Sequence, residues 1–293
     1  MTINLIFGNR KSGTTLLARL IDSKDVTVLN TETLIHTLDE VKFKIKHGKF
    51  LDAEISKYFP YPNNNEIEFD SDRYRKNISR GLNNIKDQSD FIMLHIDSFI
   101  KSTDFKNNIN ENIFIKNVGG NPDKIFNQFL QQHPESKIIS IRRNPNFIIR
   151  SIINDRRKDN PNRTYWKKDS LNLKRVALLS FEAHHNDRQQ YKYIKHQRVF
   201  TLDFNDLRER RAQALSDIMN FCGIPFSEIN TKPTLLGKKV RVTTHSINSA
   251  PGKVIFSSKK LYSGISLKEF LLIKSSIIFF FLIRSYRYLK KIN

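Results

Sequence analysis

The order of apolar and polar positions along the chain predicts strands that alternate with helices. Short apolar runs rich in β-branched and aromatic residues indicate buried strands, and after a turn each is followed by apolar residues at helical spacing. The expected strands are 3–7, 26–29, 113–115, 137–142 and 198–203, and the helices after them are expected at 14–22, 33–46, from 122, from 145 and at 205–221. This alternation predicts an α/β fold: a doubly wound parallel sheet with helices on both faces.

The remaining segments extend this domain rather than form a second core. Further helices are expected at 72–86, 91–100 and 170–195, and the chain after Phe226 becomes a loop that folds back over the sheet. We expect residues 1–245 to form the α/β domain and residues 246–293 to form a C-terminal loop and an apolar, basic helix of the same domain. A chain of 293 residues is long enough to bury one large core of this kind.

The turn between the first strand and the first helix is a candidate anion site. Gly8 and Gly13 stand five residues apart there, and Lys11 adds a full positive charge. Glycine permits backbone angles and close approaches that other residues do not, so successive N–H groups can point at one anion at the positive end of the helix dipole. Three hydroxyl donors complete the segment: Ser12, Thr14 and Thr15. The sequence therefore predicts a phosphate-binding loop.

This loop differs from the P-loop of nucleoside triphosphatases. That motif places Lys and then Ser or Thr directly after its second glycine, whereas Thr14 stands at the lysine position here. Lys11 lies inside the loop instead, two residues before Gly13, where it suits one anchored phosphate better than a metal-bridged polyphosphate. The pattern disfavours a triphosphatase, and a nucleotide kinase on the same fold stays open as an alternative.

A second phosphate motif follows the strand expected at 137–142. Arg143 precedes a helix that Pro145 begins, and Ser151 lies eight residues after Arg143. A guanidinium fork and a hydroxyl two turns into the helix can clamp a phosphate, although both residues could equally lie on the surface of an ordinary helix. Together with the first loop, this motif favours a phosphate-bearing cofactor.

Both motifs resemble those of sulfotransferases, enzymes that use 3′-phosphoadenosine 5′-phosphosulfate (PAPS) and release 3′-phosphoadenosine 5′-phosphate (PAP). The segment 10–17, Arg-Lys-Ser-Gly-Thr-Thr-Leu-Leu, is similar to the family's 5′-phosphosulfate loop, and Arg143 with Ser151 matches its 3′-phosphate motif in residues and separation. Weaker similarity covers 199–226, where Phe204-Asn205 replaces the family's Tyr-Glu, and parts of 232–249. The implied cofactor-binding residues are Arg10, Lys11, Ser12, Gly13, Thr14 and Thr15 at the phosphosulfate, and Arg143, Ser151 and Ser249 elsewhere in the cofactor site.

The resemblance also implies residues for sulfuryl transfer, which needs a base for the acceptor proton and positive charge near the departing phosphate. Cytosolic members have a histidine after the strand that ends here in Lys116, but Asn117 stands at that place. In tyrosylprotein-type members the base is a glutamate ten residues after the Asp that closes the first helix, and Glu32 stands ten residues after Asp22. The implied catalytic residues are Glu32, Lys11 and Lys116. Two alternatives stay open: Glu32 as a helix N-terminal carboxylate and Lys116 as a solvated loop lysine.

Composition limits the partners of the chain. Lys and Arg number 50 against 29 Asp and Glu, and the net charge of +21 favours an anionic sugar, an anionic lipid, a nucleic acid or a charged cofactor. We expect an acceptor hydroxyl on a glycan or glycolipid, no nucleic acid and no metal ion; a basic nucleic-acid-binding protein is the alternative from another class. The basic segment 142–168, with Tyr165 and Trp166, is either a solvated face, an acceptor wall or a nucleic-acid patch.

Cysteine content and apolar runs indicate the compartment. A single cysteine, Cys222, excludes an internal disulfide and fits a reducing environment. Because the first strand begins almost at Met1, we expect no signal peptide and a cytoplasmic protein. The apolar run 277–283 forms about 10 Å of helix, too short to span a bilayer. Flanked by Lys and Arg, it is either a final helix that closes the core or an interfacial helix in peripheral contact with a membrane.

Overall fold

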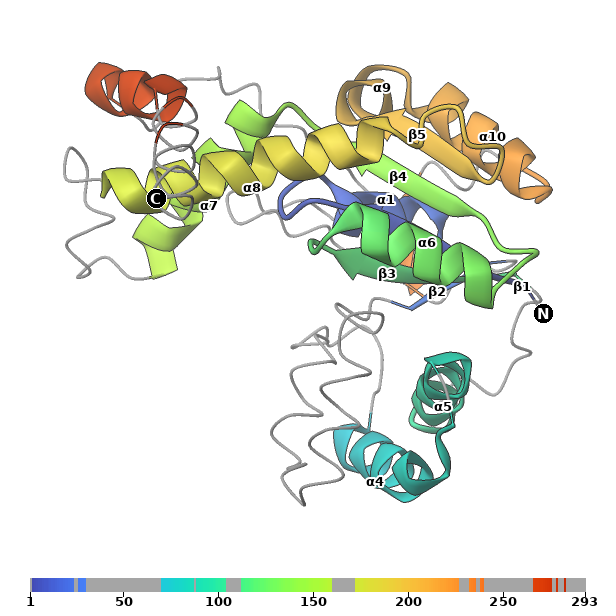
Figure 1. The fold of residues 1–293 in the computed structure, drawn as a ribbon. Coiled ribbons are helices and arrows are strands. Elements are labelled where there is room, and N and C mark those ends of the chain that lie inside the picture. The colour runs from blue at the N-terminus through green and yellow to red at the C-terminus, as the bar shows by residue number, and fades with distance from the viewer. Residues whose placement is uncertain are drawn as a thin grey trace, which may run out of the picture.

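A five-stranded parallel sheet forms the centre of the protein (Figure 1). The computed structural model describes residues 2–23, 26–29, 70–86, 88–103, 112–159, 172–226, 232–235, 238–239, 266–275, 278 and 282. The strands of the sheet are β1 (Thr2–Gly8), β2 (Thr27–Leu29), β3 (Asn112–Val118), β4 (Ile138–Arg142) and β5 (Val199–Asp203), in the order β2-β3-β1-β4-β5. The α/β fold predicted from the sequence is confirmed.

Strand β1 lies between β3 and β4 and is buried on both faces. Phe7 is opposite Asn117 of β3 on one side and opposite Ser140 of β4 on the other. Because successive side chains of a strand point to opposite faces, Leu5 and Phe7 pack in one core and Ile6 packs in the other. The chain adds β2 and β3 on one side of β1 and then β4 and β5 on the other. Ligands of open α/β sheets bind at the carboxyl ends of the strands at such a reversal.

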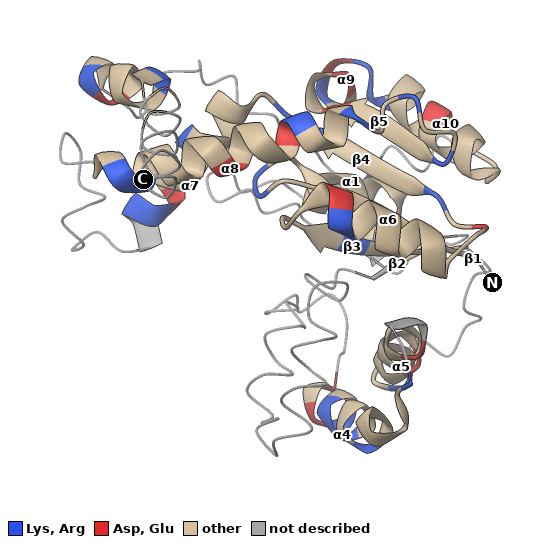
Figure 2. Cartoon of the chain, viewed as in Figure 1, with Lys and Arg blue, Asp and Glu red and all other residues tan. Residues whose placement is uncertain are grey.

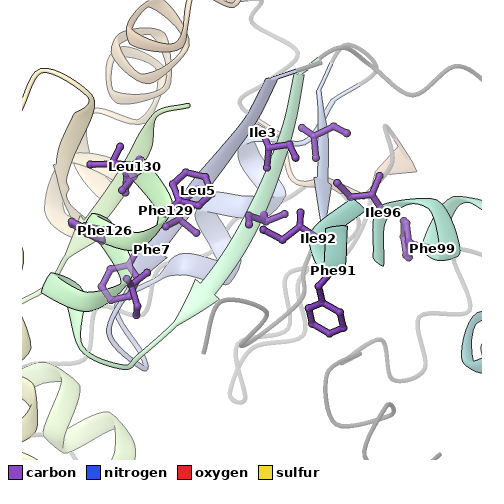
Figure 3. Packing of buried hydrophobic residues seen from close by; sticks show 14 of the residues in the cluster. Ile3, Leu5, Phe7, Phe91, Ile92, Ile96, Phe99, Phe126, Phe129 and Leu130 are labelled. Carbon is purple, nitrogen blue, oxygen red and sulfur yellow. The ribbon is translucent and has the colours of Figure 1, made fainter. Parts of the chain in front are cut away.

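Helices cover both faces of the sheet. They are α1 (Thr14–Ile21), α4 (Ser71–Gly81), α5 (Gln88–Lys101), α6 (Pro122–Gln132), α7 (Pro145–Asp159), α8 (Leu173–Tyr191), α9 (Phe204–Glu209) and α10 (Arg211–Cys222). Leu17 of α1 and Leu215 of α10 pack with Ile6. On the opposite face, the Phe126 ring of α6 meets Phe7 of β1 edge to face with 5.0 Å between centroids, and side chains of α5 belong to the same apolar cluster (Figure 3). The doubly wound arrangement follows from these two apolar layers.

Helices α4 and α5 form a hairpin joined by the short 3-10 turn Leu82–Asn84. The Tyr74 hydroxyl of α4 and Nδ1 of His95 in α5 form a buried hydrogen bond of 2.5 Å. Burial lowers the pKa of His95 to about 3, so the imidazole is neutral in the folded protein. A proton on His95 would place a charge among apolar side chains and destabilise the hairpin.

Two element boundaries differ from the sequence prediction. Strand β3 continues to Val118, so Lys116 and Asn117 lie inside a buried strand rather than in a loop after it. The single helix expected at 205–221 is divided into α9 and α10 at Arg210, whose φ of −128° and ψ of 43° are not helical. The sequence around this break contains charged residues with helical propensity and no glycine or proline, which explains why the pattern did not reveal it.

The segment after α10 folds back onto the domain, as the sequence predicted, but it contains a short hairpin rather than loop alone. Strands β6 (Thr234–Leu235) and β7 (Lys238–Lys239) pair antiparallel. The Thr234 hydroxyl donates to the carboxylate of Asp22 at 2.9 Å, beside the end of α1. The helix predicted at 33–46 lies outside the described residues. Among those residues, no helix is both long and apolar enough to cross a bilayer.

Candidate functional site

The loop between β1 and α1 turns sharply at the carboxyl edge of the sheet. Gly13 is the N-cap of α1 with a φ of 104°, and Lys11 also has a positive φ, 63°. A left-handed backbone is unfavourable for a residue with a Cβ atom, and such residues cluster at functional sites. The N–H of Ser12 donates to the carbonyl of Asn9 at 3.0 Å and closes the turn. The loop therefore ends at the N-terminus of α1, where backbone N–H groups and the helix dipole attract an anion.

The hydroxyl groups of this loop differ in their surroundings. Ser12 is fully buried, and its Oγ has no hydrogen-bond partner among the described residues. A buried hydroxyl is unfavourable unless some group, including a ligand atom, completes its hydrogen bonding. Thr14 is also buried, whereas Thr15 is exposed at the start of α1. These donors fit a phosphate oxygen at the loop.

Lys116 reaches the loop from β3, the strand next to β1. Its backbone pairs with Ile6, and its Nζ donates to Oγ1 of Thr15 at 3.1 Å. The residue is 3% exposed, so the alternative of a solvated loop lysine is wrong. A nearly buried ammonium group at a phosphate loop is placed where it can stabilise negative charge on a bound anion.

Lys11 is held by α7. Its Nζ forms an ion pair with Oδ2 of Asp155, and its carbonyl accepts a hydrogen bond of 2.7 Å from Nη1 of Arg143. Arg143 follows β4 directly, so this bond joins the first phosphate motif to the second. The two motifs lie 132 residues apart in sequence and meet at the carboxyl ends of two adjacent strands.

Arg143 is surrounded by aromatic rings and other arginines. Its guanidinium lies 4.4 Å from the ring centroid of Phe204 and 5.7 Å from that of Phe147, and Arg150 lies 5.2 Å from the Phe147 ring. Burial, together with the positive charges of Arg150 and Arg208, lowers the pKa of Arg143 to about 10. Arginines drawn together in this way favour an anion between them, because an anion offsets their repulsion. Ser151 lies half-buried in α7, next to Arg150.

A cavity of about 370 Å³ lies beside the phosphate loop. Asn9 and Arg10 of the loop and Gly119 after β3 line one part of it, and side chains of α7 and α8 line the rest. Its wall combines the aliphatic side chains Ile148 and Ile152 with the cations Arg10, Arg156 and Arg175 and the carboxylate Glu182. This composition fits a molecule with both an apolar and an anionic part.

The structure brings most of the described site residues together at this edge of the sheet. Glu32 and Ser249 are outside the described residues. Six charged residues described at the site were not predicted as cofactor or catalytic residues: Arg150, Asp155, Arg156, Arg175, Glu182 and Arg208. In the part of the chain that the structure describes, no three His, Cys, Asp or Glu residues gather as metal ligands.

The chain is similar to known proteins in sequence and in structure. A model of the sulfotransferase family matches residues 5–228, and no curated protein sequence matches the chain. A sulfotransferase from Alicyclobacillus acidocaldarius has 14% identity and a TM-score of 0.49, with 82% of this chain and 87% of that chain aligned. Mouse sulfotransferase SULT7A1 complexed with PAP has 15% identity and a TM-score of 0.45, over 78% of this chain but only 61% of the mouse protein.

The family match begins in β1 and continues past the end of α10. It therefore contains the sheet, the phosphate loop and the arginine that follows β4. Because this match covers well over half of the sequence, the chain belongs to the sulfotransferase family.

Proposed function

We propose that the protein transfers a sulfuryl group from PAPS to an acceptor hydroxyl. The observation that carries the proposal is the bond from Arg143 to the Lys11 carbonyl, which joins the two sequence motifs at one edge of the sheet. A ligand with a phosphate at each end of a nucleoside matches two such motifs better than a single polyphosphate does.

The proposed binding roles follow the two motifs. At the 5′-phosphosulfate, Lys11 supplies charge, the N–H groups of the loop supply donors, and the unpartnered Ser12 Oγ gains an acceptor. At the 3′-phosphate, Arg143 supplies a guanidinium fork, and Ser151 and Ser249 supply hydroxyl donors. Arg150 and Arg208 add positive charge around Arg143. The remaining loop residues of the proposed binding set are Arg10, Gly13, Thr14 and Thr15.

Bound PAPS would supply a sulfuryl group carried on a phosphate. In the proposed reaction, Glu32 accepts the proton of the acceptor hydroxyl while the acceptor oxygen bonds to sulfur and the bond from sulfur to the phosphate oxygen breaks. Lys116 steadies the sulfuryl group during transfer, and Lys11 stabilises the negative charge that the phosphate gains. These lysines take the part that metal ions take in phosphoryl transfer by kinases.

We propose the cavity beside the loop as the place where the acceptor enters. Arg10, Arg156 and Arg175 outnumber Glu182 in its wall, which supports an acceptor with an anionic group, such as an acidic glycan or glycolipid. Glu182 supplies a carboxylate in the cavity wall and is the alternative base to Glu32. The lone cysteine supports the proposal that the protein acts in the reducing cytoplasm.

Ligand-dependent melting distinguishes this proposal from its alternatives. PAP at a hundredfold excess over its dissociation constant should stabilise the protein by about 2.7 kcal/mol and raise the melting temperature. ATP with magnesium should raise it much less, because Thr14 stands where a P-loop needs its lysine. An equal or larger shift with ATP and magnesium would favour a nucleotide kinase. Salt-sensitive binding of DNA or RNA without any shift from PAP would favour a nucleic-acid-binding protein.

A further inference from the structure

The C-terminal helical segment, described at residues 266–275, 278 and 282, exposes a stripe of aliphatic side chains. Leu267, Leu271, Ile278 and Leu282 are 75%, 56%, 62% and 62% exposed, and all four lie in helical conformation. Leu267 and Leu271 are four residues apart in one helical stretch, which places them about 40° apart around a helix of 3.6 residues per turn, and Ile278 and Leu282 are a second exposed pair four residues apart in sequence. These four exposed side chains define the stripe.

The opposite side of the same segment is fixed to the domain. Ile273 is buried, and Leu272 packs against the same cluster of α7 and α8 side chains, which includes Ile149 and Val176. Glu269 is buried and forms an ion pair with Arg157 of α7. Because this side already packs on the domain, the exposed stripe is not a core face that lacks its partner.

The start of the segment is also fixed. The carboxylate of Glu269 accepts a hydrogen bond of 3.0 Å from the N–H of Ser266, and the Ser266 hydroxyl accepts one of 3.3 Å from the N–H of Glu269. This reciprocal pair is a capping box, which sets where the helix begins. The cap and the ion pair of Glu269 together hold the rotation of the helix about its axis, so the leucines stay exposed.

Positive charges border the stripe. At helical spacing, Lys274 lies about 20° to one side of Leu267 and Lys268 about 60° to the other side of Leu271, and both lysines are exposed. Figure 2 shows blue, basic positions on the terminal helix, which is drawn in red in Figure 1. Four more basic residues follow in the sequence: Arg284, Arg287, Lys290 and Lys291. Lysine side chains at the border of an apolar face can place their stems along the face and their charges in a layer of anionic headgroups.

We propose that this stripe docks the protein on the surface of an anionic lipid bilayer, with the helix parallel to the membrane plane. Charge complementarity selects this occupant: the cations beside the stripe and the net charge of +21 favour anionic lipid and oppose a second copy of the same basic surface. The aliphatic stripe enters the boundary between headgroups and acyl chains, and the face that carries Ile273 and Glu269 remains on the domain. The docking does not depend on the proposed sulfuryl transfer.

Sedimentation of the purified full chain with vesicles tests the proposal. The protein should sediment with vesicles of phosphatidylglycerol and phosphatidylcholine, much less with phosphatidylcholine alone, and less in high salt. The variants Leu271→Glu and Ile278→Glu should each lower the partition coefficient about tenfold or more, because each puts a carboxylate into the apolar face. The matched control is Ile194→Glu, which makes the same change of charge at an exposed aliphatic residue after α8.

Thermal melting of each variant shows whether it is folded, since these side chains are exposed and their replacement should leave the transition unchanged. Three results would overturn the proposal: wild-type protein that stays in the supernatant with both kinds of vesicle, stripe variants that sediment as the wild type does, or an equal loss in Ile194→Glu. A dimer in analytical ultracentrifugation that Leu271→Glu separates would identify the stripe as an interface between two copies instead.

Discussion

Replacing Arg143 with alanine tests the link between the two phosphate motifs. The side chain follows β4, contacts the Phe204 ring and donates to the Lys11 carbonyl at 2.7 Å. The substitution therefore removes the proposed contact with the 3′-phosphate and, at the same time, a bond that holds the loop for the 5′-phosphosulfate. Both losses act on ligand binding, so we expect Arg143→Ala to bind PAP much more weakly than the wild type.

The size of the effect follows from the charge of both partners. A hydrogen bond to a charged group contributes about 1.5–3 kcal/mol, and about 1.4 kcal/mol corresponds to a tenfold change in affinity. Loss of one such bond to phosphate thus raises the dissociation constant for PAP by about 10- to 150-fold. The loosened loop adds to this, which places the expected change toward the upper end of the range.

Arg142 provides a matched control in the neighbouring position. It forms a bidentate ion pair with Asp187 of α8, with distances of 2.9 and 3.0 Å, and has no contact with the loop among the described interactions. Arg142→Ala should lower the melting temperature and leave the affinity for PAP nearly unchanged. Titration calorimetry of both variants measures the difference. Wild-type PAP affinity in Arg143→Ala, or an equal loss of PAP affinity in Arg142→Ala, would refute the placement of the 3′-phosphate at Arg143.

Two further predictions concern the lysines and the buried histidine. Lys116→Met should retain most PAP affinity and lose turnover. Lys11→Ala should lose both, because Lys11 is expected to contact the ligand before and during transfer. An equal loss of PAP affinity in the two variants would contradict these separate roles. For His95, the unfolded state takes up a proton below pH 6.5 and the folded state only near pH 3, so stability falls as the pH drops through this interval. Between pH 6.5 and pH 5 the loss is about 1.6 kcal/mol. Urea unfolding should show it in the wild type and not in His95→Gln, and an identical pH dependence in that variant would assign the loss to other groups.

The sequence was sufficient to predict the order of strands and helices along the chain and both phosphate motifs, because these features depend on local pattern. The apolar run before Gly8 is a strand, and the helix after Gly13 begins where the glycine allows a left-handed N-cap. Arg143 and Ser151 were found because their spacing across the start of one helix is itself a local signal.

Contacts between segments distant in sequence could not be predicted from local sequence pattern. Nothing near Asp155 indicates that it pairs with Lys11, and nothing near Phe204 indicates that its ring lies on Arg143. Lys116 was placed in a loop because a lysine at the end of an apolar run usually marks the end of a strand, whereas here the Thr15 hydroxyl accepts a bond from its buried ammonium. Such positions depend on how the sheet brings strands together.

Transfer of radioactive sulfur tests the central claim most directly. Full-length protein is incubated with sulfur-labelled PAPS and a panel of hydroxyl-bearing acceptors that includes acidic glycans and glycolipids, and label in the acceptor is measured together with released PAP. We predict label in at least one acceptor, a loss of about 100- to 10,000-fold in Glu32→Gln with PAP binding retained, and a far smaller loss in Glu182→Gln. Full turnover in Glu32→Gln with a severe loss in Glu182→Gln would move the base to the cavity wall. If no acceptor in the panel gains label and PAP does not stabilise the protein, the account of this chain as a PAPS-dependent sulfotransferase is contradicted.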